Sequence, residues 1–241
     1  MNMNGYDELA QFYDDMMDFD YPALCDYYES VFSKYGCYPK TVLDLCCGTG
    51  KVIAELCKRG FDMTGIDFNE NMLSRARLNL ADYPEALLLH QDMRELDLND
   101  TVDAIVCALD GFNHLADTAS LCHAFQRAAL FLNRNGLLIF DLISEEKFFK
   151  VLPENISVFD LDMVYCVWQS ELSGKRSIRH HLDLFRAVGN GKYIRCNESF
   201  REYWFNPKTV ESTLKKAGLS LLEVNSDDPM RTFYIAGKGD K

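Results

Sequence analysis

The sequence predicts an α/β fold: a mostly parallel sheet with helices on both faces, preceded by helices and interrupted by an antiparallel β insert. Three observations support this prediction. From Thr41 to Leu142, short apolar runs alternate with helical stretches. The runs are apolar throughout, as in parallel strands that are buried on both faces. Between residues 151 and 205 the helix signals vanish, and β-branched and aromatic residues dominate.

The composition limits the class of protein and its partners. The chain has 241 residues, of which 48% are hydrophobic and 26% charged, as in ordinary soluble globular proteins. No apolar run approaches the roughly 18 residues of a membrane helix, and the N-terminus lacks the features of a secretory signal. Nine scattered cysteines without a C-x-x-C pair indicate free thiols, a cytoplasmic location and no metal site. The net charge of −12 argues against nucleic acid as the main partner.

The first region, residues 1–40, is expected to form two acidic amphipathic helices that act as a lid. The chain has many acidic residues but no Lys or Arg before Lys34. Pro22 suits the first turn of the second helix, whereas Gly36 and Pro39 end it. The two tyrosines Tyr6 and Tyr13 fall two turns apart on one helix face, where they would line a site or pack in the core.

The second region, residues 41–150 together with 206–241, is expected to form the α/β core. Its predicted strands are 41–45, 61–66, 85–89, 102–108, 136–142, 219–224 and 232–236, the last two paired antiparallel. Its predicted helices follow the glycines to about residue 59, and then span 69–80, 116–132 and 207–217. Residues 151–205 form the insert, in which 177–187 and 193–205 read as a hairpin around Asn190–Gly191.

The most specific local pattern is Val42-Leu-Asp-Leu-Cys-Cys-Gly-Thr-Gly50, an apolar strand that runs into a turn with Gly48 and Gly50 and then into a helix. Asp67 ends the next strand, at the ribose-binding position of a nucleotide-binding βαβ unit. The third glycine of G-x-G-x-x-G is missing, and so is a G-x-x-x-x-G-K-[ST] phosphate loop. The pattern therefore favours an adenosine ligand without a pyrophosphate over a tight turn that binds nothing.

Four motifs in register, VLDLCCGTG, GIDFNENML, HQDMREL and VDAIVCALDGFNHL, resemble those of class I S-adenosylmethionine-dependent methyltransferases. The resemblance is closest to small-molecule enzymes of the glycine N-methyltransferase-like group. It implies a seven-stranded Rossmann-like sheet, S-adenosyl-L-methionine as the cofactor, and transfer of a methyl group by in-line displacement to a small-molecule acceptor, with an amine as one expectation. The insert would form a roof over the substrate.

The resemblance also implies a cofactor shell, carried over position by position. Asp44 would hold the amino group of the cofactor, Asp67 both ribose hydroxyls and Asp92 the adenine amino group. Tyr13 would close over the carboxylate. The complete set implied is Tyr13, Asp44, Cys46, Gly48, Gly50, Asp67, Phe68, Met72, Asp92, Met93 and Ala108. Cys46 stands where many relatives have glycine or alanine, and a packed thiol is favoured over a reactive one.

On the acceptor side the tentative candidates are Asp110, His114 and Tyr6. Methyl transfer needs mainly positioning, because the donor is already activated, and a base only where the acceptor must lose a proton. A free carboxylate at Asp110 would attract an amine and repel a carboxylate; the alternative is that Asp110 caps the following turn. His114 is either a base or a packing residue.

Three further features complete the expectations. The insert is locally basic between Lys175 and Arg201 and is expected to pair with the acidic N-terminal helices. His180 and His181 face opposite sides of a strand, and a solvated hairpin is the favoured interpretation. Two other functions stay open: a cofactor-binding regulatory module without turnover, and a nucleotide-dependent oxidoreductase, against which the missing glycine counts. The sequence carries no signal for the oligomeric state.

Overall fold

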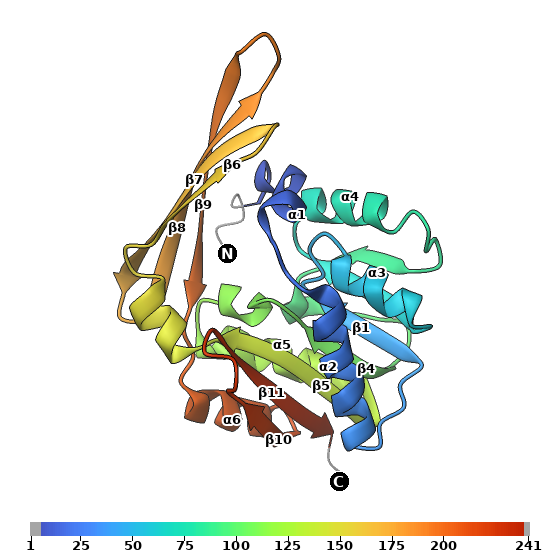
Figure 1. The fold of residues 1–241 in the computed structure, drawn as a ribbon. Helices are drawn as coiled ribbons and strands as arrows, with labels where there is room; N and C mark the ends of the chain where they lie inside the picture. Colours follow the sequence, from blue (N-terminus) through green and yellow to red (C-terminus); the bar gives the residue numbers. More distant parts are fainter. Residues whose placement is uncertain (1–5, 239–241) are drawn as a thin grey trace.

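The computed structural model describes residues 6–238. Its main element is a seven-stranded sheet in the order β10-β11-β5-β4-β1-β2-β3 (Figure 1). Every neighbouring pair is parallel except β10–β11 and β11–β5, so the predicted α/β class is confirmed. The strands are β1 (Thr41–Leu45), β2 (Asp62–Asp67), β3 (Leu87–His90), β4 (Val102–Cys107), β5 (Leu132–Ile143), β10 (Leu219–Asn225) and β11 (Arg231–Lys238).

Helices cover both faces of this sheet because its strands are apolar on both sides. In β1, Val42 packs toward one hydrophobic cluster and Leu43 toward the other, as the twofold period of a strand requires. The first cluster includes residues of α2 (Tyr21–Lys34), α3 (Lys51–Lys58) and α4 (Glu70–Asn79). The second includes residues of α5 (Thr118–Phe131) and α6 (Pro207–Lys216).

The N-terminal segment differs in detail from the two helices that were expected. A 3₁₀ turn, η1 (Leu9–Gln11), and a single helical turn, α1 (Tyr13–Met16), stand in place of the first helix. The second helix, α2, begins as predicted: Asp20 accepts a hydrogen bond from the amide of Ala23, and Pro22 lies in the first turn. We call residues 6–16 the lid segment.

The insert forms a second, antiparallel sheet that we call the roof: β6 (Ile156–Asp160), β7 (Val164–Gly174), β8 (Ser177–Ala187) and β9 (Tyr193–Tyr203), in that order. Figure 1 shows the lid segment between the roof and the seven-stranded sheet. Leu9, Phe12 and Met16 pack there against Leu182 and Phe200 of the roof. A turn of π-helix, η4 (Lys147–Val151), leads from β5 into the roof.

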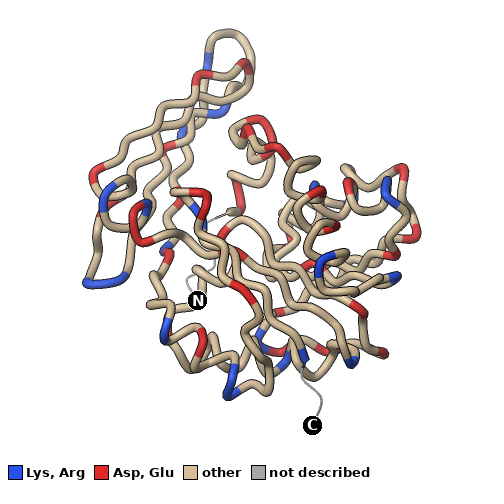
Figure 2. The backbone as a smooth tube through the Cα atoms, turned by 60° about the horizontal axis from the view of Figure 1, so that its bottom comes forward, with Lys and Arg blue, Asp and Glu red and all other residues tan. Residues whose placement is uncertain are grey.

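The charges of the roof are arranged differently from the prediction. Figure 2 shows Lys and Arg interspersed with Asp and Glu along the roof. Two roof cations form ion pairs within the roof, Arg195 with Asp183 at 2.8 Å and Arg179 with Glu171 at 3.9 Å. Within residues 6–238 only Arg186, 3.9 Å from Glu8, joins a roof cation to the lid segment by an ion pair. No helix of the described chain is both long and apolar enough to cross a bilayer.

Candidate cofactor and acceptor site

A cavity of about 420 Å³ lies at the carboxyl ends of β1, β2 and β4, where α/β sheets bind ligands. The core, the lid segment and the roof all contribute to its wall. It brings together ten of the residues singled out from the sequence: Tyr6, Tyr13, Asp44, Cys46, Gly48, Asp67, Phe68, Met72, Ala108 and His114. Four others are not part of its lining: Gly50, Asp92, Met93 and Asp110.

The turn after β1 owes its shape to left-handed backbone conformations. Gly48 and Gly50 have φ angles of 53° and 76°. A Cβ on Gly50 would also lie 3.1 Å from the Cβ of Ala76, so glycine lets α3 approach α4 closely. Cys46 has φ 61° although it carries a side chain, a conformation that is uncommon outside glycine. Gly50 therefore shapes the turn although it does not line the cavity.

Asp67 ties this turn to the end of β2. Its Oδ2 accepts a hydrogen bond from the amide of Gly48 at 2.9 Å, and its Oδ1 accepts one from the amide of Asn69 at 2.8 Å. Burial raises the pKa of Asp67, and the backbone amides partly oppose this shift. Each oxygen keeps a further lone pair with which it can accept a hydroxyl hydrogen. The carboxylate is thus both a structural clamp and an acceptor on the cavity wall.

Asp44 provides the test of whether these residues suit the cofactor that the motifs imply. Its side chain is 1% exposed, and within the described chain Oδ1 has no hydrogen-bond partner. Burial raises the pKa of Asp44 well above its ordinary value. A buried carboxylate without a partner is costly, and a ligand ammonium group would satisfy it. The cavity therefore suits a nucleoside that carries an amino-acid moiety.

The two residues expected to bind the adenine, Asp92 and Met93, do not line the cavity. Asp92 binds Arg94, whose Nε lies 2.9 and 3.0 Å from its two carboxylate oxygens. Burial raises the pKa of Asp92, but Arg94 outweighs it and holds the pKa below the ordinary value. Arg94, which the sequence did not single out, lines the cavity instead. Met93 is 4% exposed and belongs to the hydrophobic core.

Aromatic rings from three separate segments meet on the acceptor side. The hydroxyl of Tyr6 lies 3.3 Å from Nε2 of His114, which ends the 3₁₀ turn η3 (Gly111–His114). The Tyr6 ring stacks on Phe200 of β9 with centroids 4.7 Å apart, and it meets Tyr13 edge-on at 6.2 Å. Burial raises the pKa of both tyrosines, so both stay protonated. Tyr6 and His114 are thus placed together, as the sequence suggested.

Asp110 fills neither of the two roles considered for it, a free carboxylate beside the acceptor or a cap of the following turn. Its buried carboxylate lies 3.0 Å from Nζ of Lys147 and 2.9 Å from Nη1 of Arg231. It makes no capping hydrogen bond to the turn that follows. Leu109 and Asp110 are both left-handed, with φ angles of 56° and 68°, and their amides donate to Asp141 of β5. The carboxylate is therefore held by two cations behind the wall and is not free to attract an amine.

Several residues at the site escaped the sequence analysis. Phe200 and Tyr203 line the cavity and were not singled out. The expectation of a solvated hairpin is wrong for His180, which is 3% exposed, whereas His181 is exposed. The alternation of β8 would have allowed one inward histidine, but only the packing of the roof on the core decides which. Lys147 and Arg231 lie too far along the chain from Asp110 for any local pattern to connect them.

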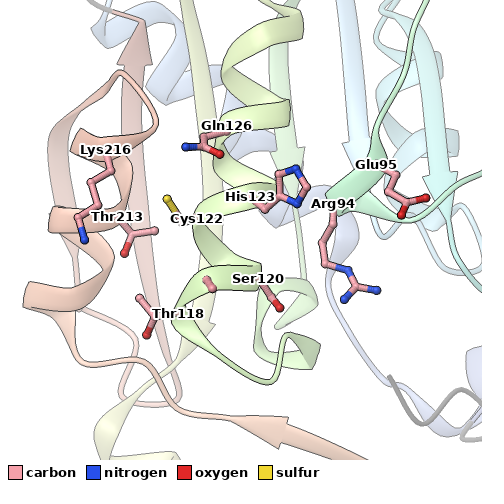
Figure 3. Close-up of a pocket in the computed structure, with 10 residues that line it drawn as sticks. Arg94, Glu95, Thr118, Ser120, Cys122, His123, Gln126, Thr213 and Lys216 are labelled. Carbon is pink, nitrogen blue, oxygen red and sulfur yellow. The ribbon is translucent and has the colours of Figure 1, made fainter.

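A second hollow, of about 770 Å³, lies between α5, α6 and the turn η2 (Met93–Glu95). Figure 3 shows the polar side chains around it, among them His123 and Lys216. It shares Arg94 and Ser120 with the first cavity but lacks the glycine turn, Asp44 and Asp67. The glycine turn and the two carboxylates therefore make the first cavity the candidate site.

Comparisons with known proteins agree with this geometry. Residues 42–136 match the family model described as a methyltransferase domain. The chain is 31% identical over 226 residues to the putative methyltransferase YqeM of Bacillus subtilis, covering 92% of this chain and 89% of that protein. An S-adenosylmethionine-dependent methyltransferase structure from Clostridium acetobutylicum superposes with a TM-score of 0.86 at 26% identity, covering 98% and 99% of the two chains.

One more relative has a named substrate. Over 99 residues, 41% of this chain and 38% of that protein, the identity is 31% to the dTDP-3-amino-3,6-dideoxy-alpha-D-glucopyranose N,N-dimethyltransferase of Streptomyces fradiae. The matched domain, the relatives and the fitting cavity lead to the same result. The chain belongs to the S-adenosylmethionine-dependent methyltransferases, and S-adenosyl-L-methionine is its cofactor.

Proposed function

We propose that this methyltransferase acts on the nitrogen of a small-molecule amine. The observation that carries the proposal is the aromatic chamber in which Tyr6 and His114 lie 3.3 Å apart beside the cofactor residues. The cofactor residues and the aromatic rings line one cavity of about 420 Å³, so the methyl donor and the acceptor would share it. The Streptomyces fradiae relative is, by its name, an N-methyltransferase of an amino sugar, which supports the same acceptor class.

In this proposal the core residues hold the cofactor. Asp44 accepts hydrogen bonds from its ammonium group, and Asp67 accepts its ribose hydroxyls while it keeps the glycine turn closed. Phe68 and Met72 contact the adenine, and Tyr13 covers the amino-acid end. The bound cofactor supplies a methyl group on a sulfonium that is already activated for displacement. The protein then contributes mainly orientation and the exclusion of water.

The acceptor nitrogen must lose a proton before its lone pair can react. The hydroxyl of Tyr6 accepts that proton from the amine as its own hydrogen passes to Nε2 of His114. Because burial raises the pKa of Tyr6, the phenol enters and leaves this exchange protonated. The two side chains of the pair thus act as one proton acceptor, with the charge ending on His114.

An assay of S-adenosylhomocysteine formation tests the proposal with a panel of amines, carboxylates and phenols, and mass spectrometry identifies the methylated atom. We expect turnover with amines and a methyl group on nitrogen. Turnover confined to oxygen acceptors would contradict the nitrogen assignment. Binding of S-adenosylmethionine with no turnover on any amine would contradict the proposed acceptor class.

A further inference from the structure

The turn that ends in His114 begins in a strained backbone conformation. Leu109 and Asp110 follow β4, and their φ angles of 56° and 68° place two successive residues with side chains in the left-handed region. Leucine is uncommon there, and such strain persists only where the surrounding structure imposes it. We call residues 109–114 the His114 turn and ask which contacts hold it.

A single carboxylate, that of Asp141 in β5, holds the start of the His114 turn. Its Oδ1 accepts the amide hydrogen of Leu109 at 2.8 Å, and its Oδ2 accepts that of Asp110 at 3.0 Å. Arg231 of β11 lies 2.7 Å from the same Oδ2 and fixes the carboxylate. Burial raises the pKa of Asp141 to about 6, an effect that Arg231 opposes, so the group is ionised at pH 8. An ionised carboxylate offers an acceptor oxygen to each of the two neighbouring amides.

The side-chain amide of Asn113 holds the end of the His114 turn. This side chain is fully buried, and both of its polar atoms have partners. Its Oδ1 accepts the amide hydrogen of Ile143 in β5 at 3.0 Å, and its Nδ2 donates to the carbonyl of Tyr203 at 2.8 Å. Tyr203 is the last residue of β9, so Asn113 joins the turn to the core and to the roof.

Between these two anchors the His114 turn packs on the hydrophobic core. The ring of Phe112 is fully buried and meets Phe125 and Phe140 with centroids 5.0 and 5.2 Å apart. His114 follows, lines the cavity and places its Nε2 3.3 Å from the hydroxyl of Tyr6. The turn is therefore fixed at its start, its middle and its end, just before the residue that meets the lid segment.

Proton acceptance by the Tyr6–His114 pair depends on this placement. A separation of 3.3 Å is near the upper limit for a hydrogen bond, so a small displacement of His114 would break the contact. A displacement of about 1 Å at a reacting group can lower a rate about a hundredfold. The anchors of the His114 turn thus bear on the reaction although neither Asp141 nor Asn113 lines the cavity.

We propose that Asp141 and Asn113 are positioning residues for methyl transfer, which hold the His114 turn so that His114 meets Tyr6. The proposal rests on the function proposed above, in which this pair accepts the proton of the amine. It gives two buried polar side chains outside the cavity a role in the reaction, distinct from any contribution to stability.

A spectroscopic measurement tests the placement without turnover. The full chain is saturated with S-adenosylhomocysteine, and NMR records the imidazole nitrogens of His114, identified by their loss in His114→Gln. Tyr6→Phe removes the hydroxyl and gives the spectrum of His114 without its partner. We expect Asp141→Asn and Asn113→Ala to move the His114 signals toward that spectrum. The signals of His123, an exposed histidine of α5, should stay unchanged.

Turnover gives a second readout. Asp141→Asn keeps the size of the side chain but replaces one acceptor oxygen by an amino group, so one of the two backbone amides loses its partner. At saturating S-adenosylmethionine the turnover number with an amine should fall at least about tenfold, whereas the affinity for S-adenosylhomocysteine should change less than about threefold. A role in stability alone would change neither the turnover number of the folded protein nor the His114 signals.

The opposite end of the sheet offers a matched control. Asp103 also accepts two successive backbone amides, those of Lys40 at 2.9 Å and Thr41 at 3.1 Å. These contacts join the amino ends of β1 and β4, and none of the three residues lines the cavity. Asp103→Asn should therefore leave the His114 signals and the turnover number unchanged.

The outcomes separate the proposal from its alternatives. A variant in which the His114 signals keep their wild-type positions overturns the role of the residue that it replaces, and an equal shift in Asp103→Asn overturns both roles. Failure of both variants to fold would assign Asp141 and Asn113 to the stability of the core and would also contradict the proposal. Absence of amine turnover in the wild-type protein would contradict the proposed function alone, because the NMR comparison needs no acceptor.

Discussion

The two sides of the cavity are built in different ways. Apart from Tyr13, the cofactor side comes from residues 44–108, in which Asp67 reaches Gly48 across only 19 residues. On the acceptor side Tyr6 meets His114 across 108 residues, and Asn113 donates to the carbonyl of Tyr203 across 90. The cofactor side is therefore encoded locally, whereas the acceptor side exists only when the lid segment, η3, the roof and β11 have come together.

The electrostatics of the two sides differ as well. On the cofactor side, Asp44 is buried and has an oxygen without a partner in residues 6–238, so ligand binding completes the wall. On the acceptor side, the cluster around Asp110 is paired without any ligand. On the cofactor side a carboxylate oxygen thus stays without a partner in residues 6–238 until the cofactor binds. On the acceptor side the carboxylate of Asp110 is already paired with Lys147 and Arg231.

The largest effect should come from breaking the acceptor-side cluster. Asp110→Asn leaves Lys147 and Arg231 with one anion fewer in a buried place, and should lower the free energy of unfolding by about 3 kcal/mol in urea titrations. Glu146→Gln, which breaks an exposed pair with Lys150, should change it by less than about 0.5 kcal/mol. An unchanged stability together with a weaker preference for amines would mean that Asp110 faces the acceptor after all.

The next largest effect should fall on cofactor binding. Asp67→Ala removes the acceptor of the ribose hydroxyls and of the Gly48 amide, and should weaken S-adenosylmethionine binding by about 1.5–3 kcal/mol. Calorimetry measures the affinity, and the turnover number with an amine at saturating S-adenosylmethionine checks the other side of the cavity. If that turnover number falls too, the two sides are not independent.

Asp44 predicts a proton linkage of cofactor binding. Its raised pKa means that the free protein holds this proton more tightly than the unfolded chain does, so the stabilisation is complete below the ordinary pKa and is lost as pH rises through the folded pKa. An ammonium group beside Asp44 favours the carboxylate, so binding of the cofactor releases protons.

The binding enthalpy should therefore vary with the ionisation enthalpy of the buffer, and the affinity should rise with pH up to the pKa of the free protein. Asp44→Asn should remove this buffer dependence. Binding whose enthalpy is the same in phosphate and Tris would place the ammonium group elsewhere.

The smallest effect concerns the lid segment. Asp14 accepts hydrogen bonds from Thr49 at 2.5 Å and Asn79 at 2.8 Å, so Asp14→Ala should make local opening of residues 6–16 easier by about 1 kcal/mol. Amide exchange measures this opening, with β4 as the internal reference. Asp15 is exposed, and Asp15→Ala should leave exchange unchanged. Wild-type exchange in residues 6–16 as slow as in β4 would identify the segment as core.

The contrast between the two sides also explains what the sequence could predict. β1 and the first hairpin strand of the roof match their predicted bounds, and β2 and β4 lie within one residue of theirs, because apolar periods and Asn-Gly turns are local signals. The cofactor residues followed from motif spacing for the same reason. Their roles remain predictions, although most of them line one cavity.

The predictions that were wrong concern residues whose contacts are distant in the sequence. Asp110 seemed free because its cations, Lys147 and Arg231, arrive from η4 and β11. The first helix was predicted from its pattern, but packing under the roof shortens it to a 3₁₀ turn and a single helical turn. Tertiary packing overrides local preference at each of these places.

The contact between the lid segment and the roof has a consequence for how the chain folds. The amide of Leu9 donates to Glu198 at 3.2 Å across 189 residues of sequence. The lid segment is synthesised before the roof, yet the surface on which it docks is made only after residue 164, when β7, β8 and β9 appear. Closing so long a loop is slow, so we expect the nascent protein to form its nucleoside pocket before its acceptor chamber. The lid segment would thus wait for the roof before it reaches its native place.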